Sequence, residues 1–129
     1  MDDQKQQEVM FKLSIFEQQI RQLQEQHQAV EQAITETGSL MYSLDDLKGS
    51  EGKEIFASIG KGIFVKGEIK SDDLIVDVGG KRFVKKSISE TQELIKKQVK
   101  KLDGIKIEIE ENLEKINEEL TKVFEEAQK

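Results

Sequence analysis

The side chains that most often carry catalysis are almost absent from this chain. Its 129 residues include one histidine, His27, and no cysteine. Without cysteine there is no disulfide and no thiolate ligand for a metal. The many carboxylates are predicted to form surface pairs with lysines one helical turn away. We therefore expect no catalytic residues, no metal site and no cofactor, and we predict that the protein is not an enzyme.

Two glycine-rich stretches have a loose similarity to phosphate-binding loops. They are Gly60-Lys61-Gly62 and Gly79-Gly80-Lys81-Arg82. Neither has the spacing of a P-loop, and neither leads directly from a strand into a helix. Glycine also tolerates the positive φ angles of tight hairpin turns, and we interpret both stretches as such turns.

Basic residues gather in two places, but the overall charge is negative. The formal net charge is −6, which argues against general binding to phosphate groups. We interpret the basic clusters as solvated faces, with a nucleic-acid site as the alternative. The clusters are Lys81, Arg82, Lys85 and Lys86, and Lys96, Lys97, Lys100 and Lys101.

No part of the sequence predicts a membrane segment. The longest apolar runs are far shorter than the roughly 20 residues that a membrane-spanning helix needs. The first ten residues, MDDQKQQEVM, are acidic and polar, unlike a signal peptide. We therefore expect a protein that has no membrane-spanning helix and binds no membrane.

Residues 1–48 are predicted to form one long coiled-coil helix. Apolar residues recur there at alternating spacings of four and three, the pattern of a coiled-coil seam. Glutamine, a good helix former, fills much of the remaining surface. The seam positions are Val9, Leu13, Phe16, Ile20, Leu23, His27, Val30, Ile34, Thr37, Met41 and Leu44.

A second long helix is predicted over residues 88–129. Ser87 and Glu90 have the spacing of a capping box at its start. Gln92 and Lys106 interrupt the apolar pattern. The first apolar column is Ile88, Ile95, Leu102, Ile109, Ile116 and Val123, and the second is Val99, Leu113, Leu120 and Ala127.

Residues 53–87 are predicted to form two linked β-hairpins. Apolar residues alternate with others over 54–59, 63–69, 74–78 and 81–86, which indicates four short strands. A two-residue turn is predicted at Gly79-Gly80. Small sheets are marginal in water and have open edges, so we expect the hairpins to pair with copies of the chain or with partner chains. The residues expected to carry this oligomerisation are Ile63, Val65, Ile69, Leu74, Val76 and Val78.

Together these elements predict an α+β fold in a single domain over residues 1–129. The helices are nearly equal in length, so we expect a long antiparallel two-helix coiled coil with the two linked β-hairpins at the turn. Pairing Leu44 with Ile88 predicts contacts between residues whose numbers sum to about 132. This register puts His27 beside Lys106 in a polar layer, which can specify register at a cost in stability. A role for His27 as a ligand or catalyst is the alternative.

Large apolar side chains near the free ends of the helices do not fit into the seam; they are Met10, Phe11, Ile15 and Phe124. We expect three of them, Met10, Phe11 and Phe124, to keep much of their surface in water. Exposed apolar patches mark interaction sites, and methionine adapts to varied partners. We predict that these three residues form an exposed apolar binding site for other proteins. A wider or looser helix contact at that end is the alternative.

Short motifs in the middle of the chain are similar to those of a known family. Residues 59–67, IGKGIFVKG, are similar to a glycine-phenylalanine-valine-lysine strand. Residues 76–80 and 84–87 are similar to the turn and the helix entry that follow it. With the order helix, two hairpins, helix, these motifs make the chain resemble the prefoldin family, and specifically its archaeal-like α-type subunit. Ala57-Ser58 stands where many relatives have a valine-proline step.

The resemblance implies an ATP-independent chaperone in the cytoplasm. Such a subunit joins β-type subunits in a hetero-hexamer, in which the hairpins form a barrel body. The ends of its helical arms capture unfolded proteins and deliver them to a group II chaperonin. A structural or scaffolding coiled-coil oligomer without client binding is the alternative function.

Overall fold

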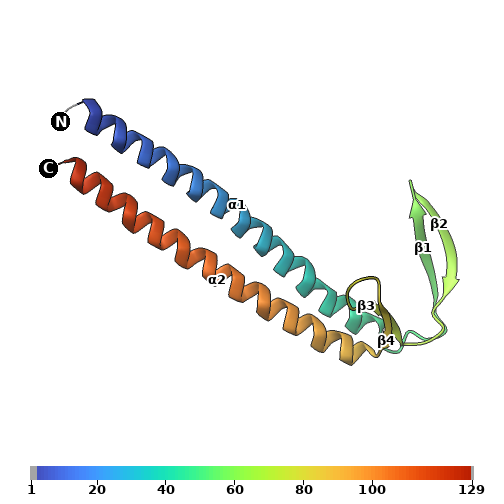
Figure 1. The fold of residues 1–129 in the computed structure, drawn as a ribbon. Coiled ribbons are helices and arrows are strands. Elements are labelled where there is room, and N and C mark those ends of the chain that lie inside the picture. The colour runs from blue at the N-terminus through green and yellow to red at the C-terminus, as the bar shows by residue number, and fades with distance from the viewer. Residues whose placement is uncertain (1–2, 129) are drawn as a thin grey trace. The chain divides into compact units, whose positions relative to one another are not determined.

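Two long helices flank two β-hairpins in the computed structural model, which describes residues 3–128 (Figure 1). The elements follow in the predicted order. They are α1 (Asp3–Leu47), β1 (Glu54–Gly60), β2 (Ile63–Glu68), β3 (Leu74–Asp77), β4 (Phe83–Lys86) and α2 (Ile88–Ala127). The predicted fold class is thus confirmed for the helices and hairpins.

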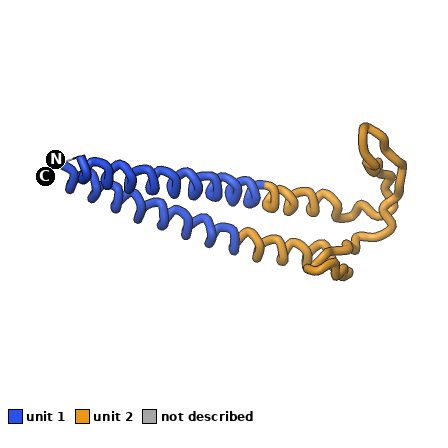
Figure 2. Tube along the Cα trace, turned by 45° about the horizontal axis from the view of Figure 1, so that its top comes forward, with its two compact units in different colours: residues 1–35, 100–129 blue, residues 36–99 orange. Residues whose placement is uncertain are grey.

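The chain divides into two compact units (Figure 2). The first unit, the helical unit, joins the part of α1 up to Thr35 with the part of α2 from Lys100 onward. The second unit, the hairpin unit, spans Glu36–Val99 and contains both hairpins. No helix within residues 3–128 is long and apolar enough to cross a membrane.

In the helical unit, α1 and α2 run side by side in opposite directions (Figures 1 and 2). The predicted seam positions are less exposed than their neighbours on each helix. The residues between these positions are nearly all exposed. Ile109 is buried and the other seam positions are half-buried. These positions are Val9, Leu13, Phe16, Ile20, Leu23, His27, Val30 and Ile34 on α1, and Leu102, Lys106, Ile109, Leu113, Ile116, Leu120, Val123 and Ala127 on α2.

The capping box predicted at the start of α2 is present. The backbone N–H of Glu90 donates to Oγ of Ser87 at 3.0 Å, and the Ser87 N–H donates to Oε1 of Glu90 at 3.2 Å. These bonds satisfy amide groups that have no partner within the helix. Ile88 and Ile95, which follow the cap, are buried in the hairpin unit.

At its other junction with the hairpins, α1 ends in a left-handed turn. Gly49 has a φ of 73°, a conformation that glycine adopts without the steric penalty of a side chain. The N–H of Ser50 donates to the carbonyl of Leu47, and its hydroxyl donates to the carbonyl of Asp46. Ser50 is buried with both of these groups bonded.

The hairpins form two separate antiparallel sheets, β1–β2 and β3–β4. In the first, Lys61 and Gly62 have positive φ and make a two-residue turn between the paired residues Gly60 and Ile63. Within residues 3–128 each sheet has only two strands, so the chain does not close a barrel by itself. The barrel between subunits remains a prediction.

The predicted two-residue turn of the second hairpin is wrong. A two-residue turn is expected at Gly79-Gly80, but Val78 donates to the carbonyl of Arg82, which leaves three residues in the loop. Lys81, the third, has a φ of 62°. The N–H of Gly79 donates to Oδ1 of Asp77, which holds the start of this longer loop.

Candidate binding surfaces

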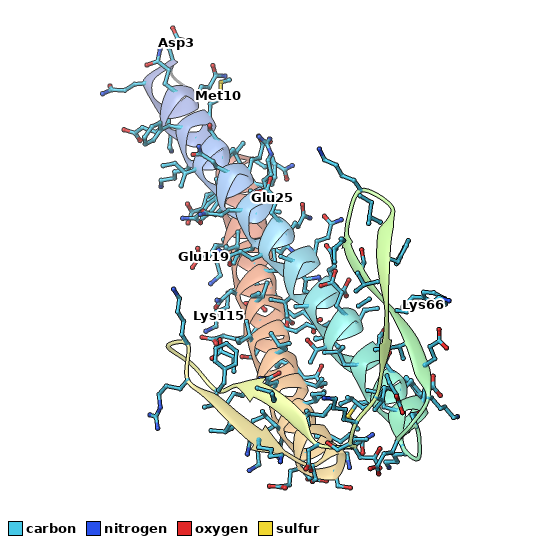
Figure 3. The ribbon with its side chains drawn as sticks, turned by 90° about the vertical axis from the view of Figure 1, so that its right-hand side faces the viewer. Asp3, Met10, Glu25, Lys66, Lys115 and Glu119 are labelled. Carbon is cyan, nitrogen blue, oxygen red and sulfur yellow. The ribbon has the colours of Figure 1, made fainter. Side chains whose placement is uncertain are left out.

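The three residues predicted to bind clients are exposed in the helical unit. Met10, near the start of α1 (Figure 3), is 69% exposed and Phe11 is 68% exposed. Phe124, near the end of α2, is 49% exposed. The seam next to them is half-buried, so these side chains are not needed for the contact between the helices. Their exposure agrees with the sequence analysis, and client binding remains a prediction.

Ile15 extends this apolar surface and is missing from the predicted site. It lies four residues after Phe11, so the two side chains fall on one face of α1. Ile15 is 37% exposed. It also begins a shallow groove of about 510 Å³ whose other lining residues are Gln18, Gln19, Arg21, Gln22 and Glu25.

A second shallow groove, of about 420 Å³, runs along α2. Its lining residues come from this helix alone: Glu110, Leu113, Glu114, Asn117, Glu118 and Thr121. Phe124 follows Thr121 after three residues and therefore continues the same face. This groove is not among the predicted sites, although the i, i+4 spacing of Glu110, Glu114 and Glu118 is visible in the sequence.

The polar layer in the helical unit contains more charge than predicted. Nε2 of His27 lies 3.0 Å from Oε1 of Glu110, and Nδ1 lies 3.8 Å from Oε1 of Glu31. Nζ of Lys106 lies 3.5 Å from the same oxygen of Glu31. His27 and Lys106 therefore share a layer, as predicted, but carboxylates lie beside both side chains. The direct partner of His27 is Glu110, one turn beyond Lys106.

Gln92, the other break in the apolar pattern of α2, also reaches across to α1. In the hairpin unit its Nε2 donates to Oδ1 of Asp45 at 2.8 Å and to the carbonyl of Met41 at 3.3 Å. The bond from Gln92, followed by one from Lys48, lowers the pKa of Asp45 below its ordinary value. Both interruptions of the seam are therefore polar contacts between the helices.

The residues predicted to carry oligomerisation divide into two groups. Ile63, Val65 and Val78 are exposed and free to meet another chain. Val76 is half-buried. Ile69 and Leu74 are also half-buried and line a cavity of about 280 Å³ within their own hairpin unit, together with Leu47, Ile55 and Ile88.

The register of β3–β4 shows which of its faces is free. Leu74 and Val76 lie on the half-buried face. Ile75 pairs with Lys85, and Phe83 pairs with Asp77, so Ile75 and Phe83 lie together on the opposite face. Ile75 is 77% exposed and Phe83 is 64% exposed. This apolar face is absent from the predicted site, although the strand LIVD carries apolar residues on both sides.

The β1–β2 hairpin likewise has an exposed aromatic face. Phe56 pairs with Lys66 and Phe64 with Ser58, which places both rings on one side of the sheet. They are 67% and 58% exposed. Neither Phe56 nor Phe64 is among the residues predicted to carry oligomerisation.

Comparisons with known proteins agree with this architecture. A sequence model described as Prefoldin subunit matches residues 16–129. The prefoldin subunit alpha of Methanobrevibacter smithii is 31% identical over 112 residues, which cover 86% of this chain and 77% of that one. Prefoldin subunit alpha 1 of Methanocaldococcus jannaschii is 27% identical over 116 residues, covering 90% of this chain and 80% of that one.

A solved structure supports the fold. The cryo-EM structure of filamentous PFD from Methanocaldococcus jannaschii matches with a TM-score of 0.81 at 20% identity. The match covers 89% of this chain and 97% of the other. With two helices, two hairpins, the matching sequence model and several α-subunit relatives, this chain belongs to the prefoldin family and is an archaeal-like α-type subunit.

Proposed function

We propose that this chain is a subunit of an ATP-independent chaperone that captures unfolded proteins and delivers them to a group II chaperonin. The observation that carries the proposal is the exposure of Met10, Phe11 and Phe124 at the ends of the two helices. Large apolar side chains that a helical pair leaves in water can bind the apolar residues that an unfolded client exposes. Capture of this kind needs no catalytic group, so the function that we propose is not enzymatic.

Each apolar contact is weak, so capture requires several arms. Fully burying one large apolar side chain is worth about 1.5–3 kcal/mol, and a mobile client buries it only in part. We call the helix ends that carry Met10, Phe11 and Phe124 the tips. Several tips on one assembly raise the local concentration of binding sites and so raise the overall affinity. We therefore propose that the functional form is an oligomer, a hetero-hexamer with β-type subunits in the cytoplasm.

The hairpins are the proposed site of this assembly. Two-stranded sheets are marginally stable alone, and their open edges can pair with strands of other chains. The exposed residues Ile63, Val65 and Val78 would then be covered, as would the apolar faces of both hairpins.

The experiment that tests client capture is light scattering of an aggregating client in the presence of the assembled complex. Replacing Met10, Phe11 and Phe124 together by serine removes the exposed apolar surface from the tips. We expect the triple variant to lose suppression of aggregation while its oligomer mass and helix content stay unchanged. The matched control replaces Gln6, Gln7 and Gln128 by serine, three exposed residues at the same ends.

Two outcomes would contradict the proposal. Equal suppression by the triple variant and the wild type would remove the tips as the binding site. No suppression by the wild type, at any ratio to the client, would favour a scaffolding oligomer without clients.

A further inference from the structure

The groove on α2 and Phe124 form one continuous surface. Leu113, Asn117, Thr121 and Phe124 follow one another at spacings of four, four and three, so they lie along a single face of the helix. Glu110, Glu114 and Glu118 form the neighbouring row of the groove. An apolar side chain at one end is thus followed by a row of carboxylates.

None of the described residues that line this groove is basic. The wider surroundings are acidic as well. The described parts of the helical unit, residues 3–35 and 100–128, carry 14 acidic side chains and eight basic ones. The hairpin unit, residues 36–99, carries 11 of each. The net negative charge of the protein is therefore concentrated in the unit that contains the tips.

We propose that the α2 groove selects client segments in which a large apolar residue is followed or preceded by lysine or arginine. The inference rests on the proposed function, since it names the class of client that the tips prefer. The apolar residue would contact Phe124, and the basic side chain would contact Glu118 or Glu114. Glu110 is already bonded to His27, which leaves the other two carboxylates as the principal partners.

The dimensions of helix and strand give the expected spacing in the client. At about 1.5 Å per helical residue, Glu118 and Glu114 lie about 9 Å and 15 Å along α2 from Phe124. An extended client segment advances about 3.3 Å per residue. The basic residue should therefore stand about three to five positions from the apolar one.

The charges should contribute preference rather than most of the affinity. Glu114 and Glu118 are exposed, so an ion pair formed with either is screened by water and salt. One exposed pair of this kind changes affinity by roughly 1.4-fold to fivefold. Apolar contact with Phe124 remains the condition for binding.

Short unstructured peptides labelled with a fluorophore test the inference on the assembled complex by fluorescence anisotropy. One peptide has phenylalanines each followed by lysine at the fourth position. The second has glutamate in place of every lysine, and the third has serine. We expect the order lysine, serine, glutamate in affinity, with the differences lost at high salt.

The variant Glu114→Gln with Glu118→Gln should make the three peptides bind alike. The matched control, Glu119→Gln with Glu126→Gln, has the same change in net charge on the same helix but leaves the groove intact. It should keep most of the preference for lysine. If control and groove variants reduce the preference equally, general charge and not the groove is responsible, and the inference is wrong.

The two proposals fail in different ways. If the three peptides bind the wild type equally and the serine variant of Met10, Phe11 and Phe124 binds none, client capture stands and the charge preference is refuted. If that serine variant binds all peptides as well as the wild type does, the tips are not the client site and both proposals fail.

Discussion

Nε2 of His27 on α1 lies 3.0 Å from Oε1 of Glu110 on α2. His27 occupies a seam position that is otherwise apolar, and its side chain is 24% exposed, whereas that of Glu110 is 50% exposed. The polar pair therefore sits where a leucine would contact the facing helix. Its contribution must be compared with the apolar contact that it replaces.

Replacing His27 by leucine should stabilise the helical unit. A polar pair near the surface contributes at most about 1 kcal/mol, whereas burying most of a leucine contributes about 1.5–3 kcal/mol. The expected gain is about 1 kcal/mol, seen as a higher melting temperature by circular dichroism at neutral pH. A lower melting temperature would show that the contacts of His27 with Glu110 and Glu31 outweigh the apolar gain.

Glycine to alanine substitutions should have opposite effects in the helix and in the turn. Gly104 lies within α2, and an added Cβ meets nothing within 4 Å. Gly104→Ala should stabilise the protein by about 0.5–1 kcal/mol, because alanine loses less backbone entropy in a helix. Gly62 also has open space, but its φ is 77°. Gly62→Ala should therefore destabilise the first hairpin. Equal shifts in melting temperature for both variants would contradict this assignment.

The capping box should make the start of α2 sensitive to acid. The bond from the Ser87 backbone, followed by that with its side chain, lowers the pKa of Glu90. A carboxyl whose pKa is lower in the folded state stabilises that state above its unfolded pKa, near 4.3. That stability is lost as the pH falls through the folded pKa. Glu90→Gln should therefore destabilise the protein at pH 7 and have progressively less effect below pH 4.

Ser87→Ala provides the comparison for this cap. Loss of its hydroxyl removes the acceptor for the Glu90 N–H, at a cost of about 1 kcal/mol at neutral pH. Thermal unfolding of both variants from pH 7 to pH 3 checks the prediction. A difference between Glu90→Gln and wild type that does not change with pH would contradict the role of the carboxylate.

The two faces of β3–β4 should respond differently to substitution. Ile75→Ser with Phe83→Ser removes apolar groups that are exposed in the single chain, so assembly should weaken while the subunit stays folded. Leu74→Ala enlarges the cavity that also borders Leu47 and Ile88, and should destabilise the subunit by roughly 1–2 kcal/mol. Sedimentation and thermal unfolding separate these effects. Lys85→Ser, on the same face as Ile75, is the control and should leave the mass of the assembly unchanged.

Periodicity alone was sufficient to predict most of the local structure. The four-and-three spacing from Val9 to Leu44 identifies the half-buried line of α1, and Ser87 with Glu90 marks the start of α2. The period of two in residues 54–86 places four strands and two turns within a few residues of their observed positions. Such patterns depend on neighbours within one or two turns of the chain, which the sequence contains directly.

The partners across elements were decided by the tertiary structure. A repeating seam places apolar residues opposite apolar residues again after a shift of one turn, so spacing cannot choose between Lys106 and Glu110 as the partner of His27. Leu74, Ile75 and Val76 are all apolar, so alternation cannot tell which side of β3 packs within its own unit. In the structure Leu74 lines a cavity together with Leu47 and Ile88, so its side of β3 is half-buried. The other side, with Ile75 and Phe83, stays in water.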